Sequence, residues 1–221
     1  MIVTRAEVIS GLKVSVLAAG PPVAEAGAAM VLVHGRGASA DDILGIADLL
    51  EAPGFVYLAP QAAGNAWYPM PFTYPLEENE PHLSRSLGVI EGILAHLAAG
   101  GLDVERTILL GFSQGACLSL EFAARNPRRY GGVVGLSGGL IGPDGLARDG
   151  SGSLDGTPVF LGCSDVDPWI GIERVRFSAD FLEKLGGDVD LRVYPGMGHT
   201  IVGDELGAVR GMIGGIPGSA R

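Results

Sequence analysis

The sequence has few basic residues, few cysteines and no long hydrophobic run. Its 15 lysines and arginines stand against 25 aspartates and glutamates, which gives a formal net charge of −10. No basic cluster is present that could neutralise phosphates, so the composition argues against a nucleic-acid partner or an anionic membrane surface. Proline, glycine and charged residues interrupt every apolar run. The sequence therefore predicts no stable insertion into a membrane.

The chain contains only two cysteines, Cys117 and Cys163, which could in principle pair. Cys117 falls inside a predicted helix and Cys163 at the end of a predicted strand, so we expect two buried free thiols, as is typical of a reducing compartment. Residues 1–10 alternate in polarity and include Arg5 and Glu7, and they lack the apolar core of a signal peptide. We therefore expect a cytoplasmic protein.

The composition suits one α/β domain over residues 1–221, because 47% hydrophobic residues are enough for a substantial core. Residues 3–9 and 12–17 predict an antiparallel hairpin around Ser10 and Gly11. Strands are predicted at 30–33, 55–59, 107–112, 132–136, 158–163 and 189–194, and helices at 40–51, 84–99, 114–125, 171–185 and 204–213. This order predicts a mostly parallel sheet with the N-terminal hairpin antiparallel, helices on both faces and no large lid domain.

One predicted strand runs into a serine between two glycines. Residues 109–116 are Leu-Leu-Gly-Phe-Ser-Gln-Gly-Ala, with Ser113 as the serine. This is the layout of a nucleophile elbow, a sharp strand-to-helix turn that exposes a serine hydroxyl. The turn leaves no room for a Cβ two residues before or two residues after the serine, so both positions are glycine. With 36 glycines the pattern can recur by chance, and residues 135–139 repeat it around Ser137. Only Ser113 is followed by a helix-forming sequence, so we predict Ser113 as the elbow and Ser137 as a small residue ending a strand.

A serine hydroxyl needs a base within hydrogen-bond reach and usually a third group that holds the base. The one histidine after Ser113 is His199, just beyond the last predicted strand. Enzymes with a nucleophile elbow have the order serine, acid, histidine along the chain. The acid is Asp165 or Asp167, and we favour Asp167 because Pro168 restricts it to an extended conformation. We expect the other aspartate to cap a turn or the next helix.

Acyl transfer also needs N–H donors aimed at the developing oxyanion. We predict the backbone amides of Gln114, which follows the nucleophile, and of Arg36, in the loop after an early strand. His34 in that loop is interpreted as a loop-stabilising residue, since no second histidine or cysteine stands at metal-ligand spacing. His82 and His96 precede the elbow and are predicted to be structural or solvent-exposed. The sequence predicts neither a metal nor a cofactor.

Residues 60–83 form a long connection rich in proline and aromatic residues. A connection of this length in a compact domain is usually functional, and this one follows a strand end, where α/β proteins bind ligands. We predict that Trp67, Tyr68 and Phe72, together with Trp169 from the loop that holds the acid, contact the substrate. The alternative is a packed surface loop whose aromatic side chains fill a gap.

With these residues in place, the chain resembles the phospholipase/carboxylesterase family of α/β-hydrolases, which includes acyl-protein thioesterases and small bacterial carboxylesterases. The resemblance covers residues 31–203. It rests on Val-His-Gly at 33–35, the 60–69 segment with its tryptophan, Gly-Phe-Ser-Gln-Gly at 111–115, Leu-Ser-Gly at 136–138, Asp-Pro at 167–168 and Gly-His at 198–199. The resemblance implies an ester-cleaving hydrolase without a cofactor, in which Ser113, Asp167 and His199 act as nucleophile, acid and base.

The chain departs from the thioesterase branch of that family at three places. The branch tends to have an apolar residue in place of Arg36, a His-Gly pair in place of Cys163-Ser164, and an apolar-Pro pair in place of residues 169–171. These positions belong to the rim of the expected site. They bear on the substrate more than on the mechanism.

We therefore expect a serine carboxylesterase that hydrolyses short to medium acyl esters, with a small-molecule ester as its partner. A long-chain lipase would need a large apolar segment to cover its site, and the chain has little length left for one. The alternatives are an acyl thioesterase or lysophospholipase with the same three residues, and a non-catalytic binding protein on the same fold. A cysteine hydrolase is disfavoured because neither cysteine occupies the elbow. The oligomeric state stays open, with a homodimer as one candidate.

Overall fold

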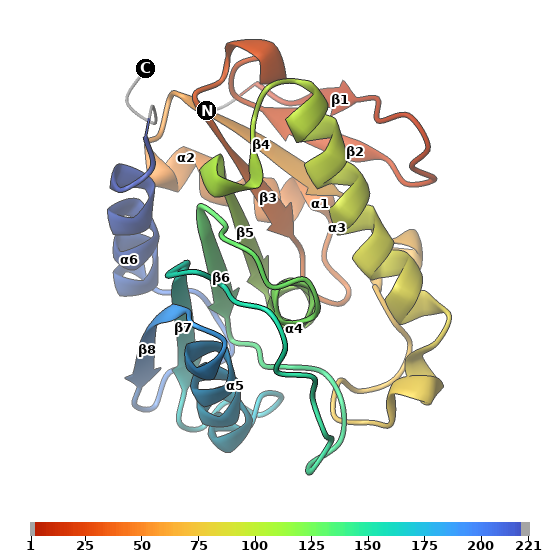
Figure 1. The fold of residues 1–221 in the computed structure, drawn as a ribbon, viewed down its shortest axis with the longest axis vertical. Coiled ribbons are helices and arrows are strands. Elements are labelled where there is room, and N and C mark those ends of the chain that lie inside the picture. Colours follow the sequence, from red (N-terminus) through yellow and green to blue (C-terminus); the bar gives the residue numbers. More distant parts are fainter. Residues whose placement is uncertain (1–2, 218–221) are drawn as a thin grey trace.

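The computed structural model describes residues 3–217, which form one eight-stranded sheet with helices on both sides (Figure 1). The strands are β1 (Arg5–Glu7), β2 (Val16–Ala19), β3 (Ala28–Val33), β4 (Phe55–Pro60), β5 (Thr107–Phe112), β6 (Gly132–Leu136), β7 (Pro158–Ser164) and β8 (Asp188–Tyr194). Their order across the sheet is β1-β2-β4-β3-β5-β6-β7-β8. β2 runs antiparallel to β1 and β4, and the other neighbouring pairs are parallel. The predicted mostly parallel sheet with an antiparallel N-terminal hairpin is confirmed.

The helices cover both faces of this sheet, as predicted. They are α1 (Ala40–Leu44), α2 (Ile46–Leu50), α3 (His82–Ala99), α4 (Gln114–Arg125), α5 (Ile172–Lys184) and α6 (Gly203–Gly214). α3, α4 and α5 lie on one face, and α1, α2 and α6 on the other (Figure 1). Each face has its own apolar core: Ile90, Leu118 and Val175 belong to the first, and Ile43 and Leu206 to the second.

Two elements differ in extent from the prediction. The hairpin ladder ends at Glu7, so residues 8–15 connect its two strands. Within this connection Leu12 packs against α3 and the core beneath it instead of continuing the ladder. The helix predicted at 40–51 is divided between α1 and α2, which meet at Gly45.

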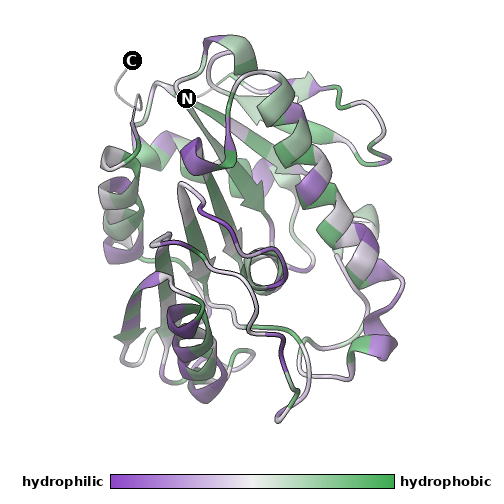
Figure 2. Ribbon diagram, viewed as in Figure 1, coloured by the Kyte–Doolittle hydropathy of each residue, from purple (hydrophilic) through white to green (hydrophobic). Residues whose placement is uncertain are grey.

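Successive residues of the central strands face opposite cores. In β3, Val31 and Val33 belong to the core under α3, α4 and α5, whereas Met30 and Leu32 belong to the core on the other face. All four side chains are fully buried. A parallel strand covered on both sides has no polar face, so its sequence is apolar without interruption, as the colouring of the central strands in Figure 2 shows.

The carboxyl ends of the parallel strands meet at one edge of the sheet, where β3, β5, β7 and β8 lead into the segments that hold Arg36, Ser113, Asp167 and His199. The segments between the strands and α-helices contain only short 3-10 helices, at Val23–Glu25, Ala63–Asn65, Leu76–Asn79 and Val104–Arg106. Residues 3–217 therefore include no inserted lid domain. In this same part of the chain no helix is both long and apolar enough to cross a membrane.

Both cysteines are buried and neither forms a disulfide, as predicted. Burial raises the pKa of Cys117 and of Cys163 to about 12. Both thiols therefore stay protonated at neutral pH, which makes them poor nucleophiles.

Candidate active site

Ser113 lies on the turn between β5 and α4, with φ 55° and ψ −119°. A positive φ is uncommon for a residue other than glycine, and a strained turn of this kind is the feature of a nucleophile elbow. The flanking glycines are required by space. A Cβ on Gly111 would lie 2.2 Å from the backbone of Gly115, and a Cβ on Gly115 would lie 2.0 Å from the carbonyl oxygen of Val33. The strand-turn-helix structure predicted around Ser113 is present.

Ser137, in the second match to the elbow pattern, directly follows β6 and begins no helix. Its side chain is fully buried. The two glycines of this pattern allow close packing against two helices: a Cβ on Gly135 would lie 2.7 Å from the side chain of Leu120 in α4, and one on Gly139 would lie 2.9 Å from that of Arg174 in α5. Both glycines therefore have packing roles at and just beyond the end of β6. Ser137 ends a strand, as predicted.

The structure brings Ser113, His199 and Asp167 into one hydrogen-bonded chain. The Ser113 hydroxyl oxygen is 2.8 Å from Nε2 of His199, and Nδ1 of the same ring is 2.7 Å from Oδ2 of Asp167. With the ring proton on Nδ1, the histidine donates to the carboxylate, and Nε2 is free to accept the serine proton. The ring of Phe112 lies 4.9 Å from the imidazole, centroid to centroid, and helps to hold it.

Of the two candidate acids, Asp167 is the one that contacts the histidine. Its second oxygen, Oδ1, accepts hydrogen bonds from the amides of Trp169 at 2.9 Å and Ile170 at 3.0 Å. Burial acts to raise the pKa of Asp167, but the hydrogen bonds from the histidine and these amides outweigh it, and the pKa lies below its ordinary value. Asp165 instead accepts a 2.8 Å hydrogen bond from the amide of Gly196 and caps the turn after β8.

The two residues predicted to supply oxyanion donors lie close to Ser113. α4 begins at Gln114, whose amide is one of the first-turn donors without a partner inside the helix. Arg36 follows Gly35, which packs so closely against the elbow that a Cβ on it would lie 3.3 Å from Cβ of Ser113. The structure thus places both residues beside the serine, as the oxyanion prediction requires.

The side chains of these same two residues hold the segment after β4, a contact that sequence reasoning missed. The Gln114 side-chain oxygen accepts from the amide of Trp67 at 2.9 Å, and its nitrogen donates to the carbonyl of Tyr68 at 2.8 Å. The guanidinium of Arg36 donates at 2.7, 3.0 and 3.2 Å to the carbonyl oxygens of Tyr68, Pro69 and Met70. The Tyr68 carbonyl therefore accepts hydrogen bonds from the side chains of both residues that are predicted to supply oxyanion donors.

A cavity of about 570 Å³ opens beside Ser113 and His199. Three of the four side chains predicted to contact substrate line it, namely Tyr68, Phe72 and Trp169. Tyr68 is buried, whereas Trp169 is 73% exposed at the rim. The rest of the lining comprises Arg36, Pro69, Pro71, Gln114, Cys117 and Ile170. One wall therefore comes from the segment after β4, and another from the loop after β7.

Trp67 lies outside this lining, so the structure does not support the prediction that it contacts substrate. Its indole is buried, and Nε1 donates a 2.8 Å hydrogen bond to the carbonyl oxygen of His34. His34 is buried as well; its Nδ1 donates to the carbonyl of Gly35 at 2.7 Å, and its Nε2 accepts from the amide of Ala62 at 3.1 Å. Trp67 and His34 together support the loop that carries Arg36, in line with the loop-stabilising role predicted for the histidine.

Trp67→Phe is expected to lower kcat more than it raises KM. The substitution keeps an aromatic ring but removes the indole N–H, which leaves the buried carbonyl of His34 unpaired at a cost of about 1–3 kcal/mol and lets the oxyanion loop shift. Steady-state kinetics on an aryl ester, together with thermal unfolding, measure the two effects. A raised KM with unchanged kcat would show that the indole contacts substrate instead.

The remaining histidines lie on α3. His82 begins this helix and is exposed, and Nε2 of His96 is 3.2 Å from Oε1 of Glu7. Both fit the prediction of a structural or solvent-exposed residue. Within residues 3–217, no group of three or more histidine, cysteine or acidic side chains is placed to hold a metal ion.

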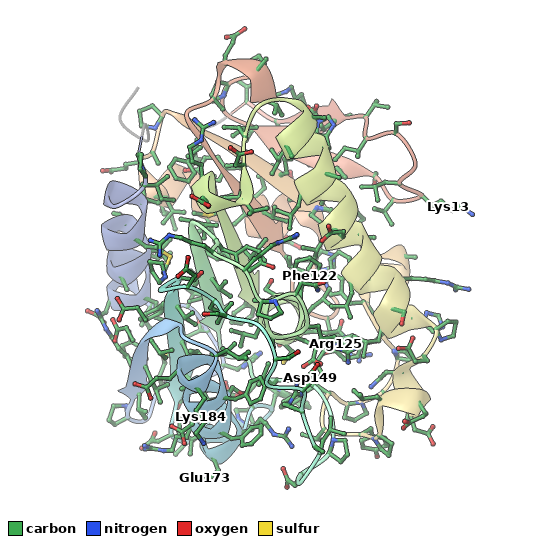
Figure 3. All side chains as sticks on the ribbon, in the orientation of Figure 1. Lys13, Phe122, Arg125, Asp149, Glu173 and Lys184 are labelled. Carbon is green, nitrogen blue, oxygen red and sulfur yellow. The ribbon has the colours of Figure 1, made fainter. Side chains whose placement is uncertain are left out.

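A second cavity, of about 360 Å³, lies next to α4, and its lining includes the charged side chains of Glu121, Arg125, Arg148 and Asp149. Glu121 is buried there and pairs with Arg125 at 2.7 Å and Arg148 at 3.0 Å. It also accepts a 2.9 Å hydrogen bond from the amide of Ile141. Figure 3 labels Arg125 and Asp149 at this place. Because the carboxylate of Glu121 is fully paired within the protein, this cluster serves to fasten the connection between β6 and β7 to α4.

Glu205 is a buried carboxyl on α6, close to the loop of His199. It accepts a 2.9 Å hydrogen bond from the amide of Val202, and burial raises its pKa to about 7 from an ordinary 4.5. Between these two values the folded state binds more protons than the unfolded state. The free energy of unfolding therefore falls as the pH rises through this window.

Glu205→Gln is expected to remove this dependence. The variant should be more stable than the parent protein above pH 7, where the parent must bury a charge, and close to it near pH 5, where the folded parent is protonated. Urea unfolding at a series of pH values measures the difference. A difference that stays constant across the series would contradict the raised pKa.

The strand order, the serine on a strained turn after β5 and the histidine after the last strand define an α/β-hydrolase. Residues 18–214 match the family model for phospholipase/carboxylesterase. The chain belongs to the phospholipase/carboxylesterase family.

Solved structures and curated relatives agree with this membership. A phospholipase/carboxylesterase from Dyadobacter fermentans is 40% identical with a TM-score of 0.85, over 89% of this chain and 94% of that one. A carboxylesterase from Mesorhizobium loti, 20% identical with a TM-score of 0.75 over 95% and 99% of the two chains, supports the fold alone. Acyl-protein thioesterase 1 of Saccharomyces cerevisiae is 34% identical over 62% of this chain and 65% of its own length. That of Gibberella zeae is 38% identical over 51% and 49%, so the chain spans roughly half to two thirds of these curated relatives.

Proposed function

We propose that the protein is a serine carboxylesterase that hydrolyses short to medium acyl esters through an acyl-enzyme. The observation that carries the proposal is the hydrogen-bonded chain from Ser113 through His199 to Asp167 at the wall of the cavity. A serine hydroxyl becomes nucleophilic at neutral pH when a histidine takes its proton and a carboxylate holds that histidine. The similarity to a phospholipase/carboxylesterase and to acyl-protein thioesterases supports the same reaction class.

In the first half-reaction the Ser113 oxygen attacks the ester carbonyl carbon while Nε2 of His199 takes the hydroxyl proton. The carbonyl oxygen becomes an oxyanion, which the backbone amides of Gln114 and Arg36 stabilise. Ionised Asp167 stabilises the imidazolium that forms. When the tetrahedral intermediate collapses, the bond to the leaving oxygen breaks, and His199 gives its proton to the departing alcohol.

In the second half-reaction a water molecule replaces the alcohol. His199 takes a proton from the water as its oxygen adds to the acyl carbon, and the same two amides hold the second oxyanion. Collapse breaks the bond between Ser113 and the acyl group, and the proton passes from His199 to the serine oxygen. One ester and one water thus give one acid and one alcohol, and the protein is regenerated.

The cavity supports a short to medium acyl group. Its volume of about 570 Å³ falls within the usual range for small-molecule sites. Pro71, Phe72 and Ile170 make parts of its walls apolar. A long acyl chain would need a larger apolar cover than these side chains provide, and residues 3–217 include no inserted lid.

An acyl thioesterase or a lysophospholipase would use the same three residues, and the curated thioesterases favour the first of these. The experiment compares kcat/KM for an aryl ester, the corresponding thioester and a lysophosphatidylcholine of the same acyl length. We expect the aryl ester to be the best substrate. A higher value for the thioester or for the phospholipid would reassign the substrate, and no turnover of any of them would favour a binding protein.

We also propose that the protein works in the cytoplasm. Its two cysteines support this, because both are buried as free thiols, the form that a reducing compartment maintains. Fractionation of cells that produce the protein should recover it with cytoplasmic markers, and recovery outside the cell would contradict the proposal.

A further inference from the structure

The guanidinium of Arg36 lies on the wall of the cavity that holds Ser113. Its three hydrogen bonds to the carbonyl oxygens of Tyr68, Pro69 and Met70 fix it there. A guanidinium has five N–H donors. Two bonds from Nη2 and one from Nη1 use three of them, which leaves Nε–H and one Nη1–H for a ligand. Because the group is already held in place, it loses little further freedom when it binds.

The positive charge of Arg36 is not neutralised by the protein. Its three partners are neutral carbonyls, and it forms no ion pair within residues 3–217. Over the same residues, the cavity lining includes no other arginine or lysine. The chain as a whole carries a net charge of −10. Arg36 is therefore an exposed local positive charge at the rim of the cavity in an otherwise acidic protein, and a single cation of this kind suits a ligand with one negative charge.

The chemistry of the proposed reaction assigns each wall to one half of the substrate. His199 must give its proton to the leaving oxygen, so the alcohol lies on the side of His199, beside Trp169 and Ile170. The acyl group then extends toward the other wall, which is formed by Arg36, Tyr68, Pro69, Pro71 and Phe72. Arg36 therefore faces the acyl half of the ester.

We propose that the site selects acyl groups that carry a carboxylate, with Arg36 binding that carboxylate. The substrates are monoesters of dicarboxylic acids, in which Ser113 attacks the esterified carboxyl and Arg36 binds the free one. This inference deepens the proposed esterase function and rests on it. A hydrogen bond between a guanidinium and a carboxylate is about twice as strong as one between neutral groups, which makes the charge a basis for selection.

The test compares the monoethyl esters of succinic, glutaric and adipic acids with counterparts in which the free carboxyl is a carboxamide. The two members of each pair have the same length and nearly the same shape, so the ratio of their kcat/KM values reports the charge. Release of ethanol measures both. In the best-fitting pair, kcat/KM for the anionic ester should exceed that for the carboxamide ester by about tenfold or more, as expected for a hydrogen bond to a charged group.

Arg36→Met should bring this ratio close to unity, and Arg36→Lys should keep part of it. The effect of either variant on the carboxamide ester measures the loss of the contacts to the segment after β4. Arg106→Met is the matched control, because Arg106 also donates to backbone carbonyls, those of Gly27 and Gly101, at the amino end of β5, away from the cavity. It removes the same charge and should leave the ratio unchanged.

Titration calorimetry on the Ser113→Ala variant makes the same comparison without turnover. The anionic ester should bind about tenfold more tightly than the carboxamide ester, and adding Arg36→Met should cancel the difference. Equal binding of the two, or equal losses on both when Arg36 is replaced, would overturn the preference for a carboxylate and leave the esterase proposal intact. Absence of turnover by the native protein would contradict the esterase proposal, while the binding comparison would still decide the role of Arg36.

Discussion

Ser113→Ala is expected to lower kcat for ester hydrolysis by a factor on the order of 10⁵ or more. The substitution removes the oxygen that forms the bond to the acyl carbon, and no other group on the cavity wall is placed against His199 as Ser113 is. Cys117 also lines the cavity, but its thiol has a pKa raised to about 12 by burial and is a poor replacement nucleophile. KM should change little, because the walls of the cavity stay in place.

Ser137→Ala is the matched control for this prediction. Ser137 has the same glycine-flanked sequence pattern and also a positive φ, of 50°. It is fully buried and does not belong to the cavity lining. Its replacement should leave kcat within about twofold of the native value, as for a substitution outside a unit of residues that act together. Comparable losses from the two serine variants would contradict the assignment of Ser113 as the nucleophile.

Asp167→Asn is expected to lower kcat by about 10⁴-fold with the fold intact. The asparagine amide would donate to Nδ1 of His199, which places the ring proton on Nε2, where it blocks acceptance of the proton from Ser113. The loss should therefore appear in kcat, with a smaller change in KM. Single-turnover kinetics with an aryl ester separate the acylation step from the rest of the cycle.

Asp165→Asn tests the competing acid in the same loop. An asparagine oxygen can still accept the hydrogen bond that Asp165 takes from the amide of Gly196. The variant should therefore keep most of the native kcat. A loss as large as that of Asp167→Asn would mean that the carboxylate of Asp165, and not the contact between Asp167 and His199, determines the rate.

The sheet and its helices were predictable because the pattern of apolar residues and the positions of glycine and proline indicate the same strands and helices along the chain. Strands covered on both faces are apolar without interruption, as at 107–112, and glycine or proline marks the ends of the helices between them. The first hairpin was predicted with too long a ladder. Ile9 and Leu12 continue the apolar pattern of a strand, yet they pack into the core beside α3, a choice that only the folded chain reveals.

The positions of the serine, the acid and the histidine were predictable for a similar reason. A strained turn requires glycines at fixed places, and the parallel sheet brings the loops after its strands to one edge. The side-chain contacts across the segment after β4 were not predictable. Trp67 is an aromatic residue in a segment that forms part of the cavity wall, but its indole donates to the carbonyl of His34 instead. Nothing in the sequence indicates that the side chains of Gln114 and Arg36 both donate to the carbonyl of Tyr68.

The most direct test of the account is the intact mass of the protein after reaction with a fluorophosphonate, which phosphonylates an activated serine with release of fluoride. We predict one adduct per chain, located by peptide mapping at Ser113. The adduct should be absent from Ser113→Ala and retained in Ser137→Ala. Labelling that persists unchanged in Ser113→Ala would contradict the claim that Ser113 is the nucleophile.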